Sequence, residues 1–125
     1  MSDQQNDPYA GLQDRLAKTT DEARAETVAK RHARGGRTAR ENLADLTDGG
    51  AVSEYGQLAV AAQRTRREGD ALYADTAADA VITAVGAVNA ELFPGEDSQT
   101  ALIINDYSVL AGTQGYFHHR KIDRL

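Results

Sequence analysis

Two apolar stretches in the second half of the chain decide its fold. Residues 80–88 read AVITAVGAV and residues 101–104 read ALII, and both are rich in β-branched side chains. Between them, residues 89–99 read NAELFPGEDSQ, with the Pro-Gly pair and the polar residues of a turn. Short apolar runs bounded by turn residues are typical of neighbouring buried strands. The sequence therefore predicts two adjacent strands as the centre of the fold.

The residues after these strands predict a loop and a helix. Residues 107–115 read YSVLAGTQG, which predicts another extended piece that runs into a glycine-containing loop. Residues 116–125 predict the opening of a helix, with His118, Ile122 and Leu125 on one face. Arg120 and Arg124 stand four residues apart on the opposite face.

The first half of the chain predicts helices. Residues 9–33 carry a thin apolar stripe at three- and four-residue steps, which is typical of a charged helix lying on a partner surface. Gly35 and Gly36 end this helix, and TARE at residues 38–41 provides a capping box for the next one. DGG at residues 48–50 ends that second helix, and residues 51–61 predict a short extended piece.

Composition excludes several classes of protein. The 125 residues are enough for one small domain, and the chain contains no cysteine, so disulfides and thiolate chemistry are excluded. Three histidines, one alone and two adjacent, do not suit a zinc site, and no metal site is expected. Neither a membrane-spanning run nor a secretory signal is present. We therefore expect a cytoplasmic protein without a membrane partner.

The charges are segregated along the chain. The net charge is −5, yet eleven of the fourteen basic residues fall within residues 30–40, 64–67 and 120–124. A negative chain whose basic clusters contain no interleaved aromatic residues is a poor candidate for nucleic-acid binding. Local binding of an anion stays open. The cluster at residues 30–40 either reaches a phosphate or complements the dipole of its own helix, and the second interpretation is favoured.

Several motifs occur in a characteristic order. TARE is followed by DGGAVSE at residues 48–54, then by GAVN at residues 86–89, and finally by DYSVLAGTQG and HRKIDR within residues 106–124. From about Arg31 to Leu125 the chain thereby resembles the N-terminal part of biotin-dependent acyl-CoA carboxyltransferases, the carboxyltransferase subunits of acetyl-CoA and propionyl-CoA carboxylases.

The resemblance has one departure, before the first strand. The family pattern has more glycine there than ADAVITAVGAVN at residues 78–89, so Ala80 and Thr83 are expected to alter the turn. Gly86 and Asn89 match the pattern.

The resemblance implies an α/β protein, namely the N-terminal portion of a crotonase-like (ClpP/crotonase) domain, with helices followed by the first sheet strands. Residues 1–8 are then a disordered N-terminus, residues 9–50 the N-terminal helices, and residues 51–125 the truncated beginning of the carboxyltransferase domain. Alone, such a chain is expected to be inactive, partly disordered and prone to associate, because its strands expose apolar faces and unpaired edges.

The implied function is transfer of a carboxyl group from carboxybiotin to acetyl-CoA, propionyl-CoA or a similar acyl-CoA, as in fatty acid metabolism. The implied cofactors are biotin on a partner carrier protein and coenzyme A as part of the substrate. The implied partners are biotin carboxylase, biotin carrier subunits or domains, and further copies of the full-length subunit. In this family main-chain amides hold the developing oxyanion, so no catalytic side chain is expected.

The resemblance places a set of residues beside acyl-CoA, namely Ala111, Gly112, Thr113, Gln114, Gly115, His119, Arg120 and Lys121. For the loop, a tight turn with positive φ at glycine is an equally good interpretation. For Arg120, Lys121 and Arg124, a solvated helix face or a subunit contact is favoured over binding of CoA phosphates. His118 is expected to be packed and hydrogen-bonded, and Asp106 is expected to be a turn carboxylate rather than a general base.

Two other functions remain open at this point. One is a noncatalytic, truncated carboxyltransferase-like chain that acts as an interaction module for carboxylase subunits. The other is a small α/β protein that binds anions or nucleotides without preference for CoA.

Overall fold

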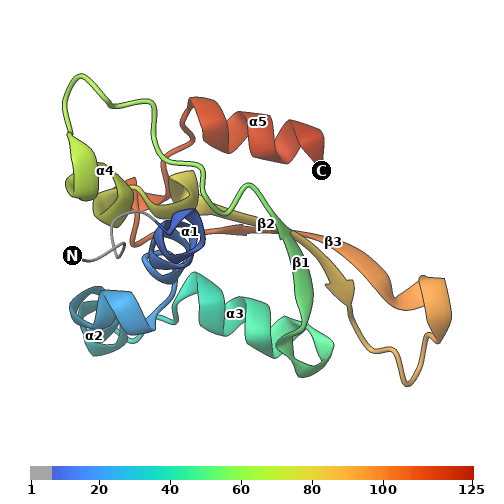
Figure 1. Ribbon diagram of the computed structural model, residues 1–125. Coiled ribbons are helices and arrows are strands. Elements are labelled where there is room, and N and C mark those ends of the chain that lie inside the picture. Colours follow the sequence, from blue (N-terminus) through green and yellow to red (C-terminus); the bar gives the residue numbers. More distant parts are fainter. Residues whose placement is uncertain (1–6) are drawn as a thin grey trace.

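The structure, a computed structural model, describes residues 7–125 and contains five α-helices and three strands within that range (Figure 1). Their bounds are α1 Pro8–Ala17, α2 Ala25–Ala33, α3 Ala39–Leu46, β1 Val52–Tyr55, α4 Gly69–Asp75, β2 Val81–Ala87, β3 Gln99–Asn105 and α5 Tyr116–Arg124. Residues 1–6 of the expected disordered N-terminus lie outside the described residues. Asp7 caps α1, which begins at Pro8, so these two residues belong to an ordered element.

The three strands form one antiparallel sheet in the order β1-β2-β3. Ile82 pairs with Ile104, and Val52 of β1 pairs with Gly86. Helices lie on both sides of the sheet, with α3 against one face and α5 against the other (Figure 1). The two apolar stretches are therefore neighbouring strands, as the sequence predicts, and the fold is the predicted mixture of helices and first sheet strands.

The apolar core lies between α3 and the sheet. It is built of Ala39 and Leu43 from α3, Ile82 and Ala84 from β2, and Leu102 from β3. Every second residue of a strand faces the same side, so the residues at 82 and 84 pack together with those paired to them on β3. Each of the five core residues is no more than 5% exposed.

The two predicted strands differ in burial. Residues 81–84 of β2 are all buried, because this central strand has a neighbour on each side and a helix on each face. In β3 only Leu102 is buried, and Ile103 is 49% exposed. The prediction of two fully buried strands is therefore wrong for β3, which is an edge strand of the described sheet.

The sequence signals that predict the start and the end of α3 are confirmed. The Thr38 side chain accepts a hydrogen bond from the Glu41 amide at 3.0 Å, and the Glu41 carboxylate accepts one from the Thr38 amide at 2.8 Å. This reciprocal pair is the capping box that the sequence predicts. The helix ends before Gly49 and Gly50, whose φ values of 66° and 70° suit glycine.

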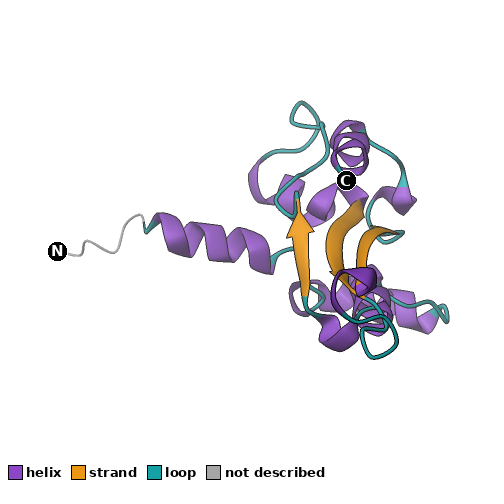
Figure 2. Cartoon of the chain, turned by 90° about the vertical axis from the view of Figure 1, so that its right-hand side faces the viewer, coloured by secondary structure: helices purple, strands orange, loops and turns teal. Residues whose placement is uncertain are grey.

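The expected single helix over residues 9–33 is broken into α1 and α2. The hydroxyls of Thr19 and Thr20 donate to the Leu16 and Ala17 carbonyls. Such local side-chain bonds compete with the helical pattern. A 3₁₀ turn at 22–24 then leads into α2. In Figure 2, α1 extends away from the rest of the chain.

Three further segments differ from expectation. The extended piece over residues 51–61 is a strand only from Val52 to Tyr55, because Gly56 leaves it with a φ of 66°. Helix α4 is a further element that the sequence does not predict. Residues 107–115 do not form an extended piece, since the chain turns there through a 3₁₀ segment over 110–112.

The backbone conformation of the turn before β2 explains why the family pattern has more glycine there. Ala78, Asp79 and Ala80 all have left-handed backbones, with φ values of 53°, 47° and 64°. Glycine adopts this conformation without steric cost, whereas other residues need surrounding contacts to hold it. Alanine and aspartate keep the left-handed turn here. Thr83 lies in the middle of β2 and donates to the Tyr55 carbonyl at 2.8 Å, so it is not part of the turn.

Candidate functional site

The candidate loop lies between β3 and α5. Ala111 and Gly112 have left-handed backbones, with φ values of 54° and 70°. The amide of Gly112 donates to the Val109 carbonyl at 2.9 Å, and that of Thr113 donates to the Leu110 carbonyl at 3.0 Å. These bonds make the loop a tight turn and occupy two of its amides, so neither amide is available to a ligand in this conformation.

Other amides of the same segment are left for a ligand. Within residues 7–125, no backbone or side-chain acceptor pairs with the amides of Gln114, Gly115, Tyr116 and Phe117. The last two form the first turn of α5, where the helix dipole adds a partial positive charge. The main-chain donors of this site are therefore concentrated at residues 114–117, slightly later in the chain than the predicted loop.

Asp79 holds the first turn of α5 from a distant part of the chain. Its Oδ2 accepts a hydrogen bond from the His118 amide at 2.8 Å, and the residue is fully buried. A Cβ atom on Gly115 would lie 3.0 Å from Asp79 Oδ1, a tighter contact than most side chains make. Since Gly115 has a φ of −92°, glycine relieves crowding here and is not needed for its backbone conformation. Asp79 is not among the residues that the sequence motifs indicate.

Lys121 lies inside the molecule. Its ammonium donates to the Ala78 carbonyl at 2.7 Å and to the Val81 carbonyl, and only 7% of the residue is exposed. Burial lowers the pKa of Lys121 to about 8, although Glu54 and Asp79 oppose this change. The structure therefore places Lys121 away from the surface that a CoA phosphate could reach, and gives it a structural role.

The remaining side chains of α5 divide between the interior and solvent. His118 is fully buried, and its Nδ1 lies 2.9 Å from the Asp79 carbonyl, so the packed histidine is confirmed. His119, Arg120 and Arg124 are exposed. Arg120 lies 5.6 Å from the centre of the Tyr116 ring, a cation–π contact within the helix.

A basic pocket of about 410 Å³ lies between α2 and the loop. Its lining is formed by Thr27, Lys30, Arg31, Arg34, Tyr107, Ser108 and Ala111. The Arg31 guanidinium stacks on the Tyr107 ring, 5.2 Å from its centre. The fold thus joins part of the first basic cluster to Ala111 of the candidate loop. The spacing of these residues in the sequence does not predict that the basic cluster and the loop lie side by side.

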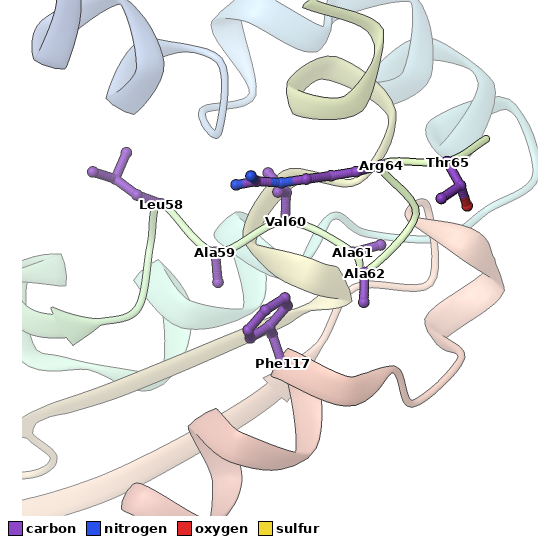
Figure 3. Close-up of a pocket in the computed structure, with 8 residues that line it drawn as sticks. All are labelled: Leu58, Ala59, Val60, Ala61, Ala62, Arg64, Thr65 and Phe117. Atoms are coloured by element: carbon purple, nitrogen blue, oxygen red, sulfur yellow. The ribbon is translucent and has the colours of Figure 1, made fainter. Parts of the chain in front are cut away.

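An apolar groove of about 410 Å³ lies between residues 58–65 and the start of α5 (Figure 3). Leu58, Val60 and their neighbours up to Thr65 form one wall, and Phe117 of α5 forms the opposite wall. Phe117 is also the last residue with an available amide at the start of α5. The sequence does not predict this groove, because its two walls are more than fifty residues apart in the chain.

Asp106 is a turn carboxylate, as expected. Its Oδ1 accepts from the Ser108 amide at 3.0 Å, and its Oδ2 pairs with Arg24 at 3.0 Å. Arg24 also donates to the Ser108 hydroxyl at 2.9 Å, which fixes the end of β3 beside α2. Among residues 7–125 no three His, Cys, Asp or Glu side chains are grouped as metal ligands. No helix in the same range is long and apolar enough to cross a membrane.

The site therefore combines uncapped main-chain amides, an adjoining basic pocket and an adjoining apolar groove in a segment of crotonase-like fold. Comparison with solved structures gives the class. The chain matches a single-chain, multi-domain long-chain acyl-CoA carboxylase with 46% sequence identity and a TM-score of 0.90, over 95% of this chain and 12% of that one.

Transcarboxylase 12S, solved with methylmalonyl-CoA and methylmalonic acid bound, matches with a TM-score of 0.68 over 99% of this chain and 22% of that one. At 21% identity, this likeness concerns the fold. No family model and no curated protein matches the chain. The chain is thus similar in sequence and fold to a part of an acyl-CoA carboxylase, in agreement with the resemblance that its motifs carry, and it spans only about an eighth to a fifth of the length of the solved structures.

Proposed function

We propose that this chain is the N-terminal segment of a carboxyltransferase that transfers a carboxyl group from carboxybiotin to an acyl-CoA. Biotin, when bound on its carrier, supplies the activated carboxyl group and accepts the α-proton of the thioester. The residues of this chain bind the acyl-CoA and stabilise the negative charge that develops on it. The observation that carries the proposal is that the amides of residues 114–117 and the basic pocket both adjoin the loop at residues 111–115.

The amides stabilise negative charge on the substrate. When the α-proton leaves, the thioester oxygen becomes an enolate oxygen, and main-chain donors fixed beforehand lower the free energy of that state. The available amides of Tyr116 and Phe117 stand at a helix N-terminus, where the dipole has the required sign. This role needs no titrating side chain.

The basic pocket binds the phosphates of coenzyme A. Lys30, Arg31 and Arg34 provide positive charge beside Tyr107, whose exposed ring can stack on a base. Arg120 and His119 lie on the exposed surface of α5, where they can extend the same binding surface. Lys121, in contrast, contributes by holding the helix.

The test is carboxylation by the complete product of the gene that encodes this chain. It is assayed with a biotin carboxylase, a biotin carrier, ATP and labelled bicarbonate, and with acetyl-, propionyl- and long-chain acyl-CoA. The expected result is a labelled carboxyacyl-CoA from at least one substrate. Failure with all chain lengths would contradict the proposed function.

Substitution in the basic pocket separates phosphate binding from chemistry. Lys30→Met combined with Arg34→Met should raise KM for acyl-CoA and leave kcat unchanged, since it removes uniform binding. The KM for the corresponding acyl-pantetheine, which lacks the nucleotide, should not change. Arg66→Met, at an exposed position outside this pocket, is the matched control. Equal effects on both thioesters would contradict the assignment of the pocket.

A second candidate function is an interaction module for carboxylase subunits. The apolar groove between residues 58–65 and Phe117 favours it, because an exposed apolar surface is typical of a docking site. The 125-residue chain should then bind purified carboxylase subunits in size-exclusion chromatography. Under either function we propose a cytoplasmic location and a homo-oligomeric full-length subunit.

A further inference from the structure

The left-handed turn at residues 78–80 is joined to α5 and its loop at successive main-chain carbonyls. The Ala78 and Val81 carbonyls accept from the Lys121 ammonium. The Asp79 carbonyl lies 2.9 Å from Nδ1 of His118, and the Ala80 carbonyl accepts from the Asp106 amide at 2.8 Å. Three consecutive left-handed residues are costly. The donors from residues 106–121 are the contacts that hold them.

The Asp79 side chain adds a contact of a different kind. It lies beneath the N-terminus of α5, which has no side-chain cap of its own, and accepts from the third amide of that helix. Its second oxygen, Oδ1, is buried without a hydrogen-bond partner among the described residues. This oxygen lies 3.0 Å from the position that a Cβ on Gly115 would take, so the carboxylate is next to the start of the helix.

A buried carboxylate with one unpaired oxygen is destabilising unless opposite charge lies nearby. Lys121 of α5 is the cation that interacts electrostatically with Asp79. Lys121 also interacts with Glu54 of β1 and Arg40 of α3, which form a bidentate pair with each other at 2.5 and 2.9 Å. The positive charge of Lys121 therefore offsets part of the negative charge of Asp79.

We propose that Asp79 is a positioning residue, which holds the first turn of α5 so that the amides of Tyr116 and Phe117 face the acyl-CoA thioester. This inference rests on the function proposed above and adds a residue that does not touch the substrate. The Asp79 carboxylate accepts a hydrogen bond from the third amide of α5, that of His118. The first two amides, those of Tyr116 and Phe117, are left for the ligand. Gly115 permits the approach, and Lys121 compensates the charge.

Hydrogen exchange on the complete gene product tests the contact itself. Asp79→Ala should accelerate exchange of the His118 amide and of its neighbours in the first turn of α5. Asp79→Asn should preserve protection, because the amide oxygen still accepts from His118. Asp123→Ala, an exposed acid on the same helix, is the matched control and should change nothing. Unchanged exchange at residues 116–118 in Asp79→Ala would overturn the inference.

Kinetics of the complete gene product test the role in catalysis. Asp79→Ala should lower kcat for carboxyl transfer by roughly tenfold to a hundredfold per folded molecule and leave KM unchanged. The displaced amides then stabilise the transition state less, whereas binding of the substrate in its ground state is not affected. Asp79→Asn should recover most of the turnover. Should Asp79→Ala fail to fold, Gly115→Ala tests the same contact from the helix side and should lower kcat in the same way.

A merely structural role gives a different result. Leu43→Ala, chosen to lose similar stability in the apolar core, should retain wild-type kcat per folded molecule. If Asp79→Ala behaves like Leu43→Ala, the positioning role is refuted. An inactive wild-type protein would instead refute the proposed function, and hydrogen exchange would still decide whether Asp79 holds α5.

Discussion

The two faces of the sheet are covered by helices that are held in different ways. On one face, α3 packs Ala39 and Leu43 against apolar residues of β2 and β3. On the other face, α5 is joined to the turn before β2 through buried polar groups, His118 and Lys121. Polar contact on the α3 side is the Arg40–Glu54 pair at the edge of the sheet.

This difference indicates that one helix mainly contributes stability and that the other mainly fixes the geometry of the site. Apolar packing is non-directional and contributes free energy in proportion to the area buried. Hydrogen bonds contribute little net free energy but fix direction, and an unpaired buried group is costly. We therefore expect α3 to stabilise the fold and α5 to define the orientation of the amides at its N-terminus. Four measurements distinguish these two roles.

Leu43→Ala should destabilise the protein most. The side chain is 5% exposed, and its loss leaves a cavity between α3 and the sheet, which costs about 2–5 kcal/mol. Urea denaturation monitored by circular dichroism measures this change in the free energy of unfolding. Leu46→Ala, on the same helix but 49% exposed, is the matched control and should have a much smaller effect. Equal losses would show that α3 is not held by its apolar face.

Lys121→Met should destabilise the α5 side by about 1–3 kcal/mol, because it leaves the Ala78 and Val81 carbonyls without their donor while removing a buried charge. Denaturation gives the magnitude, and exchange of amides at residues 116–118 gives the local effect. Arg124→Met, exposed on the same helix, provides the comparison. A stabilised Lys121→Met protein with unchanged exchange would contradict the role assigned to the ammonium.

Thr38→Ala should cost about 0.5–2 kcal/mol, the usual effect of removing an N-cap side chain. The hydroxyl accepts from the Glu41 amide and donates to Asp21 at 2.5 Å, so α3 and the segment before α2 both lose a contact. Thermal melting of the folded chain measures the change. Thr38→Ser, which keeps the hydroxyl, should restore most of the loss, and a neutral Thr38→Ala would refute the cap.

The last prediction concerns pH. The pKa of Lys121 is about 8 in the folded chain and 10.5 in the unfolded one, so between these values the unfolded chain binds more protons at this residue. Stability should therefore rise with pH in that window, by at most about 1.4 kcal/mol per pH unit. The measurement is the difference between wild type and Lys121→Met in urea at several pH values. A difference that falls with pH would contradict the assignment.

The sequence predicts the elements whose signals are local. The capping box at Thr38 and the glycines at 49 and 50 bound α3 correctly because caps and turns depend on neighbouring residues. The apolar run at residues 80–88 identifies β2 for the same reason. The break after Ala17 was not predicted, since Thr19 and Thr20 fit a helical stripe until their hydroxyls bond to the preceding turn.

The candidate site was predicted only in part. The motif at residues 106–124 identifies the loop and α5, but it does not show that Lys121 points inward, because the partner carbonyls lie forty residues earlier. Asp79 was missed for a similar reason. A lone acid among alanines at 77–80 is a detectable signal, since buried carboxylates are rare unless paired, yet only the fold shows that its partner is the His118 amide.

The contacts of Arg24 have a consequence for how the chain acquires its structure during synthesis. Asp106 and Ser108 follow Arg24 by 82 and 84 residues. At roughly 5–20 residues per second, a ribosome makes them about 4–16 s after Arg24. The residues that form the other wall of the pocket are made that long after the basic residues of α2. In contrast, β1, β2 and β3 pair in the order in which they are made. The sheet is therefore expected to assemble before the pocket closes.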